Sequence, residues 1–507
     1  MIVAYIILAL YLIAMTIIGF IASKRIKTIS DFISARGNLG FWVFSLLMVG
    51  SLVSGMTALG VAGLGYLTGY STWWEQIAVP LSLAISVLIF GLKLNKLASE
   101  GNILTVQDYL ARRFNNSNVL RFASAILSAF VCAVYLVGQY IAIGIIFKIT
   151  LGLDYRFGII LSLIITLAYV VMGGLLAVSW TSFVQGIIVL IGLAVSTILM
   201  VQEIGGLSVV HATLEQIGEG PFTPYLTKPW GPWDTYLISP LFLITLFGLT
   251  VPLGLAVAPH IINNVMALKR SRRIYWLPPV LFVLSFILLS SAKIIGITGR
   301  AAEYLGLIEL PKHPVIPGSK FTDAVFPVLA GNLLPPYISM FLVIIVLAAV
   351  MSTTDRLLLT FGVNVSYDIL HNVLHVSSER VINIISKISI VSVGLVTAYL
   401  AMYPPQLMAW LIWLALGIMF STWFPALTAS LYWSKVSEKA VLSSMLCGFS
   451  STLILGYICG KPPLGLGVTL TLLNAPIYFP VIGFLASTLC LIIVSLFERK
   501  GGHEVLV

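Results

Sequence analysis

Long apolar stretches, separated by short polar connections, recur from one end of the chain to the other. Each is about 20 residues or longer, the length that an α-helix needs to cross about 30 Å of hydrocarbon. The first stretch follows no basic leader and precedes no small-residue cleavage site, so we interpret it as a span and not as a signal peptide. The pattern predicts an all-α polytopic membrane protein with about 13 transmembrane helices and no soluble domain between them. We expect the spans at about residues 3–22, 41–69, 74–95, 120–149, 157–178, 183–202, 238–262, 275–297, 335–365, 381–402, 407–433, 440–460 and 476–497.

Composition and charge support this class and add an orientation. Hydrophobic residues make up 59% of the 507 residues and charged residues 9%, with a mean hydropathy of +1.06, outside the range of soluble domains. The net charge of +10 is explained by topology and not by a nucleic-acid partner, because an odd number of spans places four basic clusters on one side. We therefore expect a multi-pass protein of the cell membrane with its N-terminus outside and its C-terminus in the cytoplasm. The clusters are Lys24, Arg25, Lys27 and Arg36; Arg112 and Arg113; Lys269, Arg270, Arg272 and Arg273; and Arg499 and Lys500.

Four basic residues do not fit this orientation. They are Lys293, at the end of the eighth stretch, and Arg300, Lys312 and Lys320, in the connection that follows it. In contrast, residues 203–233 carry one basic residue, Lys228, as expected of an external loop. The clusters still favour an external N-terminus.

One apolar stretch carries four consecutive polar residues at its centre. They are Ser352, Thr353, Thr354 and Asp355, within the sequence LAAVMSTTDRLLL of residues 347–359. Ala349, Ser352 and Thr353 stand at i, i+3 and i+4 and therefore share one helical face. Two hydroxyls and a carbonyl freed by a nearby distortion would form a partial oxygen cage, which suits a small hard cation. Alternatively, the hydroxyls bond to carbonyls one turn earlier or join two helices.

Glycines interrupt the second apolar stretch. They are Gly50, Gly55, Gly60, Gly63, Gly65 and Gly69. Because glycine in a helix interior costs about 1 kcal/mol relative to alanine, this number indicates either close packing or a broken helix. In secondary transporters, discontinuous helices expose carbonyls to an ion and helix ends to a substrate. Together with the polar cluster, the glycines favour a binding site.

Several segments resemble the sodium:solute symporter family. The sequence YVVMGGLLAVSWTSFVQG of residues 169–186 has a paired glycine, an Ala-Val-Ser-Trp-Thr element and a Val-Gln, which are characteristic of that family. Residues 349–353 match the Ala-Val-Met-Ser-Thr element of the family's sodium helix. The glycine-rich second stretch, residues 258–269 and residues 424–433 are also similar to family segments. The resemblance extends from about residue 30 to 435.

This resemblance implies a leucine-transporter-like core of two inverted repeats of five helices each. The first repeat would cover residues 41–204 and the second residues 237–435, joined by an extracellular loop at 205–236. Residues 1–40 would hold an additional first helix and a cytoplasmic loop, and residues 436–507 two further helices and a short tail. An odd number of helices in each repeat produces the inverted topology.

The resemblance also implies a sodium ion between the first and eighth core helices. Its ligands would be the carbonyls of Gly50, Val53 and Ala349 and the hydroxyls of Ser352 and Thr353. Many relatives have an aspartate directly after the Ser-Trp-Thr element, where this chain has Ser182, and proline carriers have one in the first core helix, where this chain has Leu52. Because carboxylates would help to hold a second cation, their absence predicts one sodium ion per solute.

Asp355 follows the sodium hydroxyls by two residues, at a position where many relatives carry an acid. It is a candidate for the ion path, attracting cations toward an inward-open exit. Alternatively, it pairs with Arg356 or with another basic residue.

The same resemblance places a substrate pocket beside the sodium ion, between the first and sixth core helices. The candidate substrate-binding residues are Ser54, Thr57, Gln139, Thr250, Gly254 and Trp413. Gln139 is a donor and acceptor in an apolar helix, and relatives that carry carboxylates often have glutamine there; the alternative is an interhelical hydrogen bond. The sixth core helix lacks the tyrosine and asparagine of sugar carriers, so we do not expect a polyhydroxylated substrate.

These features predict a symporter that imports a small organic solute with sodium, by alternating access. The pocket fits a carboxylate-bearing solute such as a monocarboxylate, pantothenate or an amino acid such as proline. The sequence contains no visible pairing of a nucleophile with a base and no metal-binding cluster, so we do not expect an enzyme. A proton-coupled carrier of the same fold and a transporter-like sensor or channel are the alternatives. The partners expected are the solute and the lipid bilayer, and a monomer would be sufficient for transport.

Overall fold

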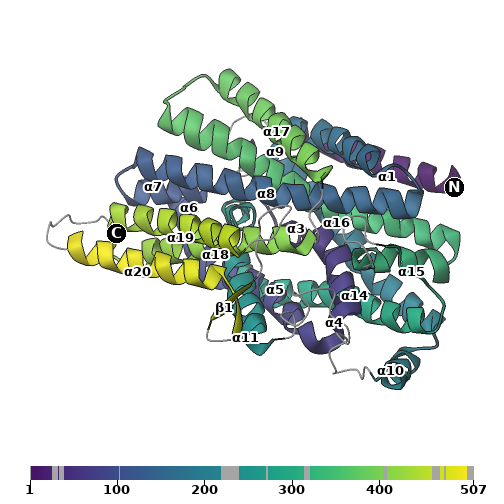
Figure 1. Ribbon diagram of the computed structural model, residues 1–507. Helices are drawn as coiled ribbons and strands as arrows, with labels where there is room; N and C mark the ends of the chain where they lie inside the picture. Colours follow the sequence, from purple (N-terminus) through teal and green to yellow (C-terminus); the bar gives the residue numbers. More distant parts are fainter. Residues whose placement is uncertain are drawn as a thin grey trace.

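The computed structural model is a bundle of long α-helices with one small β-hairpin (Figure 1). It describes residues 2–24, 32–33, 39–101, 103–218, 239–269, 272–312, 320–403, 408–459, 469–472 and 475–498. Several residues discussed above lie outside this part: Arg25, Lys27, Arg36, Lys228, Arg270, Arg499, Lys500 and most of the loop expected at 205–236.

The described residues of the first half form eleven elements, several of which follow one another directly as one bent helix. They are α1 (Ile2–Ser23), α3 (Phe41–Leu52), η2 (Met56–Gly60), α4 (Val61–Thr68), η3 (Gly69–Thr72), α5 (Trp74–Ile85), η4 (Ser86–Gly91), α6 (Leu92–Gly101), α7 (Val106–Arg113), α8 (Asn118–Leu151) and α9 (Tyr155–Glu203). Within α9, Gly174 has a φ of +48°, a conformation that glycine adopts readily. This kink lies within the span expected at 157–178 and separates the apolar helices Tyr155–Ala168 and Gly174–Glu203.

The second half begins with a short helix inside the expected loop and continues with long helices. The elements are α10 (Leu207–Gln216), α11 (Pro240–Leu243), η5 (Ile244–Thr250), α12 (Val251–Ala256), α13 (Pro259–Ile262), η6 (Asn263–Ala267), η7 (Arg272–Trp276), α14 (Leu277–Tyr304), η8 (Thr322–Ala324), α15 (Val325–Leu333), α16 (Pro336–Val363), η9 (Asn364–Val373), α17 (Glu379–Ala401), α18 (Met408–Tyr432), α19 (Glu438–Ile458), β1 (Thr469–Leu472), β2 (Ala475–Tyr478) and α20 (Pro480–Glu498). Strands β1 and β2 pair antiparallel, with Thr469 opposite Tyr478 and Leu472 opposite Ala475.

The helices confirm the prediction of an all-α polytopic membrane protein. Within the described residues, nine helices are long and apolar enough to cross a membrane, or eleven if each of two bent pairs is one span. The apolar helices Ala9–Ala22 and Tyr155–Ala168 are shorter. The number of thirteen spans is therefore not confirmed, although helices lie at all the expected positions.

Burial identifies the helices at the centre of the bundle. The most apolar window of the span Phe341–Val373 is 100% buried, whereas that of α20 is 28% buried. The outer helices expose large apolar side chains, among them Leu10 and Ile13 on α1 and Leu489 on α20. Such a surface suits contact with lipid. The helix that carries Ser352 and Thr353 is thus enclosed by protein on all sides.

Candidate functional site

The glycine-rich span breaks in its middle. Helix α3 ends at Leu52, and Val53 leaves helical geometry with a φ of −70° and a ψ of 115°. The chain resumes as the π-helix η2 at Met56, and the two halves are bent by 67° relative to each other. A helix end leaves carbonyl and N–H groups without partners in the helix. A broken helix, one of the two interpretations of the glycines, is therefore what the structure contains here.

Close packing, the other interpretation of the glycines, applies to α4 in the second half of the same span. A Cβ atom added to Gly65 of α4 would lie 2.5 Å from the carbonyl oxygen of Lys293, and one added to Gly296 of α14 would overlap the carbonyl of Ala62. Helices α4 and α14 therefore approach to backbone contact, which only residues without a Cβ permit. The glycines of one span thus serve two purposes.

Oxygen atoms from the break and from α16 lie close together. Thr353 Oγ1 is 2.5 Å from the carbonyl oxygen of Val53 and 3.3 Å from that of Gly50. Ser352 Oγ is 3.5 Å from the carbonyl oxygen of Val53 and 2.9 Å from that of Ala349. All five residues are buried. Four contacts thus link the five residues of the predicted sodium site: three of them cross from α16 to the break, and the contact between Ser352 and Ala349 lies within α16.

These oxygen atoms have the chemistry that the ligands of a sodium ion require. Three carbonyl oxygens and two hydroxyl oxygens are neutral, hard ligands, which small alkali and alkaline-earth cations prefer. The hydroxyls of Ser352 and Thr353 donate hydrogen bonds to the carbonyls, and an ion at the centre would replace these bonds with metal–oxygen contacts. Thr354 instead donates to the carbonyl oxygen of Val350, on its own helix, at 2.8 Å. The alternative that the hydroxyls bond one turn earlier holds for Ser352, whose shorter contact is to Ala349 on its own helix, and the same is seen for Thr354. Thr353 instead reaches across to the broken helix.

Ser182 on α9 faces the same region from a third helix. A Cβ atom added to Gly50 would lie 3.4 Å from Ser182 Cβ and 3.7 Å from Ser352 Cβ. The Ser182 hydroxyl is buried and has no hydrogen-bond partner among the described residues. The position at which many relatives carry an aspartate therefore lies beside the oxygen cage in this chain, where it is occupied by a neutral residue.

Gln139 on α8 contacts the break in the first core helix at Gly55. Its Oε1 atom accepts a hydrogen bond from the backbone N–H of Gly55 at 3.0 Å, and a Cβ atom on Gly55 would overlap Ala142 Cβ. Its Nε2 atom is buried and has no partner within the described part of the chain. Because an unpaired buried donor carries a desolvation cost of about 1–3 kcal/mol, Nε2 is available to a bound ligand. The interhelical hydrogen bond and a ligand contact are thus compatible.

The other candidate residues on the broken span stabilise its second half. Thr57 Oγ1 accepts a hydrogen bond from the backbone N–H of Ser54 at 3.2 Å. Both side chains are buried, with exposed fractions of 1% for Ser54 and 4% for Thr57. This contact satisfies one of the N–H groups that the break releases.

The sixth core helix also breaks, and its candidate residues lie at packing contacts. Val257 and Ala258 separate the segments Pro240–Ala256 and Pro259–Ala267, which are bent by 48°. Thr250 Oγ1 donates to the carbonyl oxygen of Thr245 at 2.8 Å. A Cβ atom on Gly254 would overlap the carbonyl oxygen of Leu416 on α18. Their assignment to a substrate pocket stays a prediction.

Trp413 on α18 packs against η5, in the first half of the sixth core helix. It has an exposed fraction of 2%, and its ring lies edge-to-face with Phe247 of η5, with centroids 6.0 Å apart. Helix α18 also contacts η2, directly after the first break. Trp413 therefore belongs to an apolar wall that connects the two broken helices.

Asp355 and Arg356 follow the sodium residues on α16 and are buried. Arg356 Nη2 donates to the carbonyl oxygen of His260, at the start of α13, at 3.3 Å. Asp355 interacts electrostatically with Tyr11 of α1 and Tyr140 of α8. This segment therefore connects α16 to α13, the second half of the sixth core helix, and the role of Asp355 in the ion path stays a prediction.

A buried ion pair lies at the other end of the broken span, and the sequence pattern did not predict it. Lys293 Nζ on α14 is 3.6 Å from Glu75 Oε2 on α5, with side-chain exposures of 0% and 3%, and it donates to Thr72 Oγ1 at 2.5 Å. Lys320 likewise pairs with Glu303, at 2.8 Å. Two of the four basic residues that conflict with the expected orientation are thus neutralised by carboxylates. A lysine inside an apolar stretch was the available signal, since such a charge requires a partner.

Two broken helices, with an oxygen cage between the first of them and α16, define a cation-coupled membrane transporter. The protein belongs to the sodium:solute symporter family, whose model matches residues 32–448. Two curated relatives align with nearly the whole chain. The osmoregulated proline transporter OpuE of Bacillus subtilis is 26% identical, over 97% of this chain and 94% of its own. A sodium/proline symporter of Staphylococcus aureus is 26% identical, over 98% of this chain and 93% of its own.

Solved structures show the same fold. A Na⁺-coupled sialic acid symporter in a substrate-bound outward-open state matches with a TM-score of 0.75 at 18% identity, covering 97% of this chain and 98% of that chain. A nucleobase-cation-symport-1 family transporter matches with a TM-score of 0.53 at 11% identity, covering 92% and 94%. The predicted leucine-transporter-like fold class, family membership and sodium-coupled import of a solute are thereby confirmed. The protein is a multi-pass membrane transporter with sodium as its coupling ion.

Proposed function

We propose that the protein imports a small carboxylate-bearing solute, with proline as the first candidate, together with one sodium ion. The break at Val53 and Ser54 carries this proposal. Its carbonyls face the hydroxyls of α16, while its released N–H group faces Gln139. One discontinuity thereby offers an oxygen cage for a cation and positions, through Gln139 Nε2, a hydrogen-bond donor for an anionic group.

The carboxylate class follows from the groups next to the break. The segment after the break starts a new helix, and helix N-termini carry a partial positive charge that stabilises anions. Gln139 Nε2 adds a buried donor without a protein partner in the described residues. The remaining wall near Phe247 and Trp413 is apolar, which fits a compact hydrocarbon portion such as a pyrrolidine ring. Two relatives are named as proline transporters, which supports the same choice.

The sodium site consists of the carbonyls of Gly50, Val53 and Ala349 and the hydroxyls of Ser352 and Thr353, whose mutual distances are those given above. Ser182 adds no charge, and Leu52 is apolar. With neutral residues at both of these positions, the charge available for a second cation is missing. We therefore expect one-to-one coupling.

The two inverted repeats, residues 41–204 and 237–435, are supported by the position of the breaks. Each proposed repeat begins with a bent helix pair, Phe41–Leu52 with Met56–Thr72 and Pro240–Ala256 with Pro259–Ala267. Interrupted helices at corresponding positions of two halves are typical of inverted-repeat transporters. With residue 1 outside, the ends of the helices near α7 and η9 face the cytoplasm, together with Arg112 and Arg113.

Uptake into proteoliposomes tests the proposal. Radiolabelled L-proline, pantothenate and lactate are offered with an inward sodium gradient or with an equal potassium gradient. We expect sodium-dependent accumulation of at least one of these solutes, with proline transported fastest, and one sodium ion entering per solute molecule. Accumulation of none of them, or two sodium ions per solute, would overturn the corresponding part of the proposal.

A further inference from the structure

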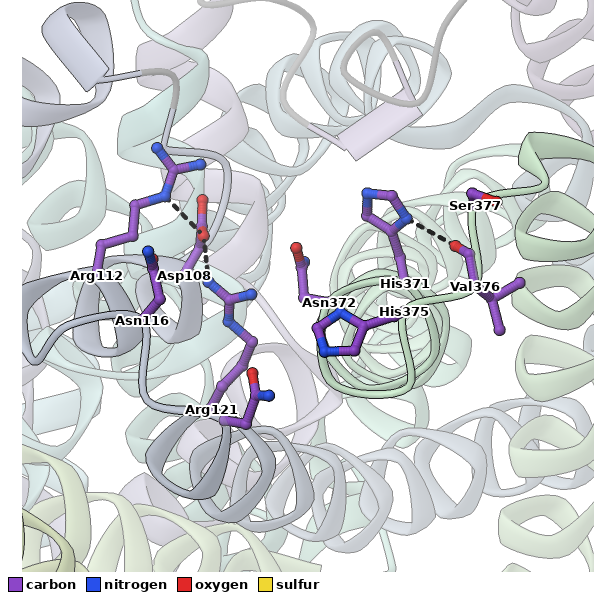
Figure 2. A pocket seen from close by; sticks show the side chains of 10 residues that line it. Asp108, Arg112, Asn116, Arg121, His371, Asn372, His375, Val376 and Ser377 are labelled. Carbon is purple, nitrogen blue, oxygen red and sulfur yellow. Dashed lines mark hydrogen bonds and ion pairs between the residues drawn. The ribbon is translucent and has the colours of Figure 1, made fainter.

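A polar cavity lies at the end of the bundle where α7, the start of α8 and the end of η9 meet (Figure 2). Its volume is about 740 Å³, within the range of sites for small molecules. Two arginines, two histidines and three asparagines are among its lining residues. The oxygen cage does not contribute to it. The transport mechanism described above therefore leaves this cavity unexplained.

One wall presents two guanidinium groups that share one carboxylate. Asp108 Oδ1 accepts hydrogen bonds from Arg112 Nε at 3.0 Å and from Arg121 Nη2 at 2.8 Å. Asp368 lies behind this wall, where its Oδ1 accepts from Thr105 at 2.8 Å, and does not line the cavity. The side chains that line the cavity on this side therefore include two guanidinium groups and one carboxylate, and Asp368 adds a second carboxylate that interacts with Arg121. Arg121 is 6% exposed, and its Nε atom has no partner among the described residues.

The opposite wall comes from the end of η9 and the turn after it. His371 Nδ1 lies 2.9 Å from the carbonyl oxygen of Val376. Because a carbonyl only accepts, Nδ1 carries the hydrogen; Nε2 is then an acceptor in the neutral ring, and both nitrogens donate in the imidazolium form, the form that binds an anion. Figure 2 shows His371, Asn372 and His375 across the cavity from Arg112 and Arg121. Nitrogen-bearing side chains thus approach the same space from two sides.

Backbone conformation also distinguishes this cavity. Of the described residues other than glycine, three have a positive φ: Asn115, Asn116 and His375. Two of these line the cavity, Asn116 with a φ of 58° and His375 with a φ of 56°. Glycine adopts this conformation at the lowest cost, and asparagine and histidine adopt it more often than most other residues with a Cβ. Two polar side chains thus stand at turn positions on the cavity wall.

We propose that this cavity binds a phosphate-bearing anion, presented by a lipid headgroup or by a soluble phosphate compound. Guanidinium groups match phosphate oxygens with paired N–H donors, and the volume is too large for a monatomic anion. Basic pockets between membrane helices at the cytoplasmic surface are known to take phospholipid headgroups. Because η9 continues the helix that carries Ser352 and Thr353, the occupant would contact the end of the sodium helix.

Binding measurements on the full-length protein test this site in two arms. In the first, inorganic pyrophosphate is titrated into detergent-purified protein by calorimetry. In the second, native mass spectrometry compares retention of phosphatidylglycerol with that of phosphatidylcholine. The variants are the double substitution Arg112→Gln with His371→Gln, and Asn116→Gly, which relieves the backbone strain and removes one side chain. Arg273→Gln, at an exposed arginine of η7 outside the cavity, is the matched control.

We expect the double variant to weaken binding about tenfold or more, Asn116→Gly to weaken it less, and Arg273→Gln to leave it unchanged. Loss of pyrophosphate binding alone assigns the site to soluble phosphate compounds, and loss of phosphatidylglycerol retention alone assigns it to headgroups. Both results support an anion site. Equal binding by the wild type, the cavity variants and the control in both arms would overturn the proposal.

Discussion

Thr353 Oγ1 lies 2.5 Å from the carbonyl oxygen of Val53, across the gap between α16 and the end of α3. The adjacent hydroxyl, that of Thr354, instead bonds within its own helix, to the carbonyl oxygen of Val350 at 2.8 Å. Two neighbouring threonines of one buried helix therefore have different partners. Thr353 is therefore the candidate for ion binding, whereas the hydroxyl of Thr354 is bonded within its own helix.

Substitution of Thr353 by alanine is expected to weaken the apparent sodium affinity about tenfold or more. The variant loses one of the five proposed ligands, and a hydrogen bond to a charged group contributes about 1.5–3 kcal/mol. Thr354→Ala should leave the sodium affinity within about a factor of two, because its hydroxyl contacts only its own helix in the geometry described. The sodium dependence of solute uptake measures both. Equal sodium affinity in the two variants would contradict the site.

Gln139→Glu separates the two functions of the Gln139 side chain. The variant keeps an oxygen for the Gly55 N–H group but replaces the Nε2 donor with a second oxygen. If Nε2 binds the solute carboxylate, a negative charge at this position repels it, so we expect uptake to be lost. Sodium binding should persist, and a sodium-dependent change in tryptophan fluorescence measures it.

Gln139→Leu is the complementary variant, since it removes the hydrogen bond to Gly55 as well as the donor. We expect it to lower thermal stability in detergent in addition to uptake, because a buried N–H group is left without a partner. A glutamate variant with normal proline uptake would assign Gln139 to the support of the break alone.

The closeness of Ser352 and Thr353 to the broken span could be anticipated from the sequence, because the family resemblance selects residues that also form a local pattern. Ser352 and Thr353 are polar within an apolar helix, and glycines mark the span that contains Val53. The direction of each hydroxyl could not be predicted, since Thr353 and Thr354 look alike in sequence. Only the packing of α16 against α3 and η2 distinguishes them.

The remaining features depend on contacts between distant segments. Glu75 and Lys293 lie on different helices, and nothing local to either residue specifies the other. Gly254 is apolar and small, so its sequence context fits a substrate pocket as well as a helix contact; its closest neighbour is the backbone of Leu416. The cavity beside Arg121 combines segments that are more than 200 residues apart. Family resemblance and periodicity carry no information on such pairs.

Lys293→Met is expected to destabilise the protein strongly. Removal of the lysine leaves Glu75 buried without its counter-charge, a change that typically costs about 3–5 kcal/mol. The double variant Lys293→Met with Glu75→Gln should recover most of this loss, because no isolated charge remains. Thermal unfolding of the four proteins of the double-mutant cycle measures the coupling. Additive losses in the double variant would show that the two residues do not stabilise each other.

Gly254→Ala is expected to reduce the amount of folded protein. The added methyl group would overlap the carbonyl oxygen of Leu416, and a backbone atom cannot move aside as a side chain can. Gly248→Ala, on the same core helix, is the control, because its Cβ would lie 3.7 Å from Ile244. Fluorescence-detected size-exclusion chromatography compares the two. A Gly254→Ala protein that folds normally but has an altered KM for the solute would instead support a place in the substrate pocket.

Asp323 is expected to make stability depend on pH. It lies on η8, outside the membrane spans, and burial raises its pKa from 3.8 to about 6. Its Oδ1 atom faces Gly63 of α4, where an added Cβ would be 2.8 Å away. Between these two pKa values the folded protein binds more protons than the unfolded chain, so stability falls as the pH rises through this window.

The substitution Asp323→Asn removes this contribution while it keeps the size of the side chain. Above about pH 6 the wild type holds a buried, charged carboxylate, so the variant should be the more stable protein, and its advantage should shrink as the pH falls toward 4. Thermal unfolding in detergent at a series of pH values measures the difference between the two proteins, in which the other titrating groups cancel. A difference that does not change between pH 4 and 7 would show that the Asp323 carboxyl has the same affinity for protons in the folded and unfolded chains.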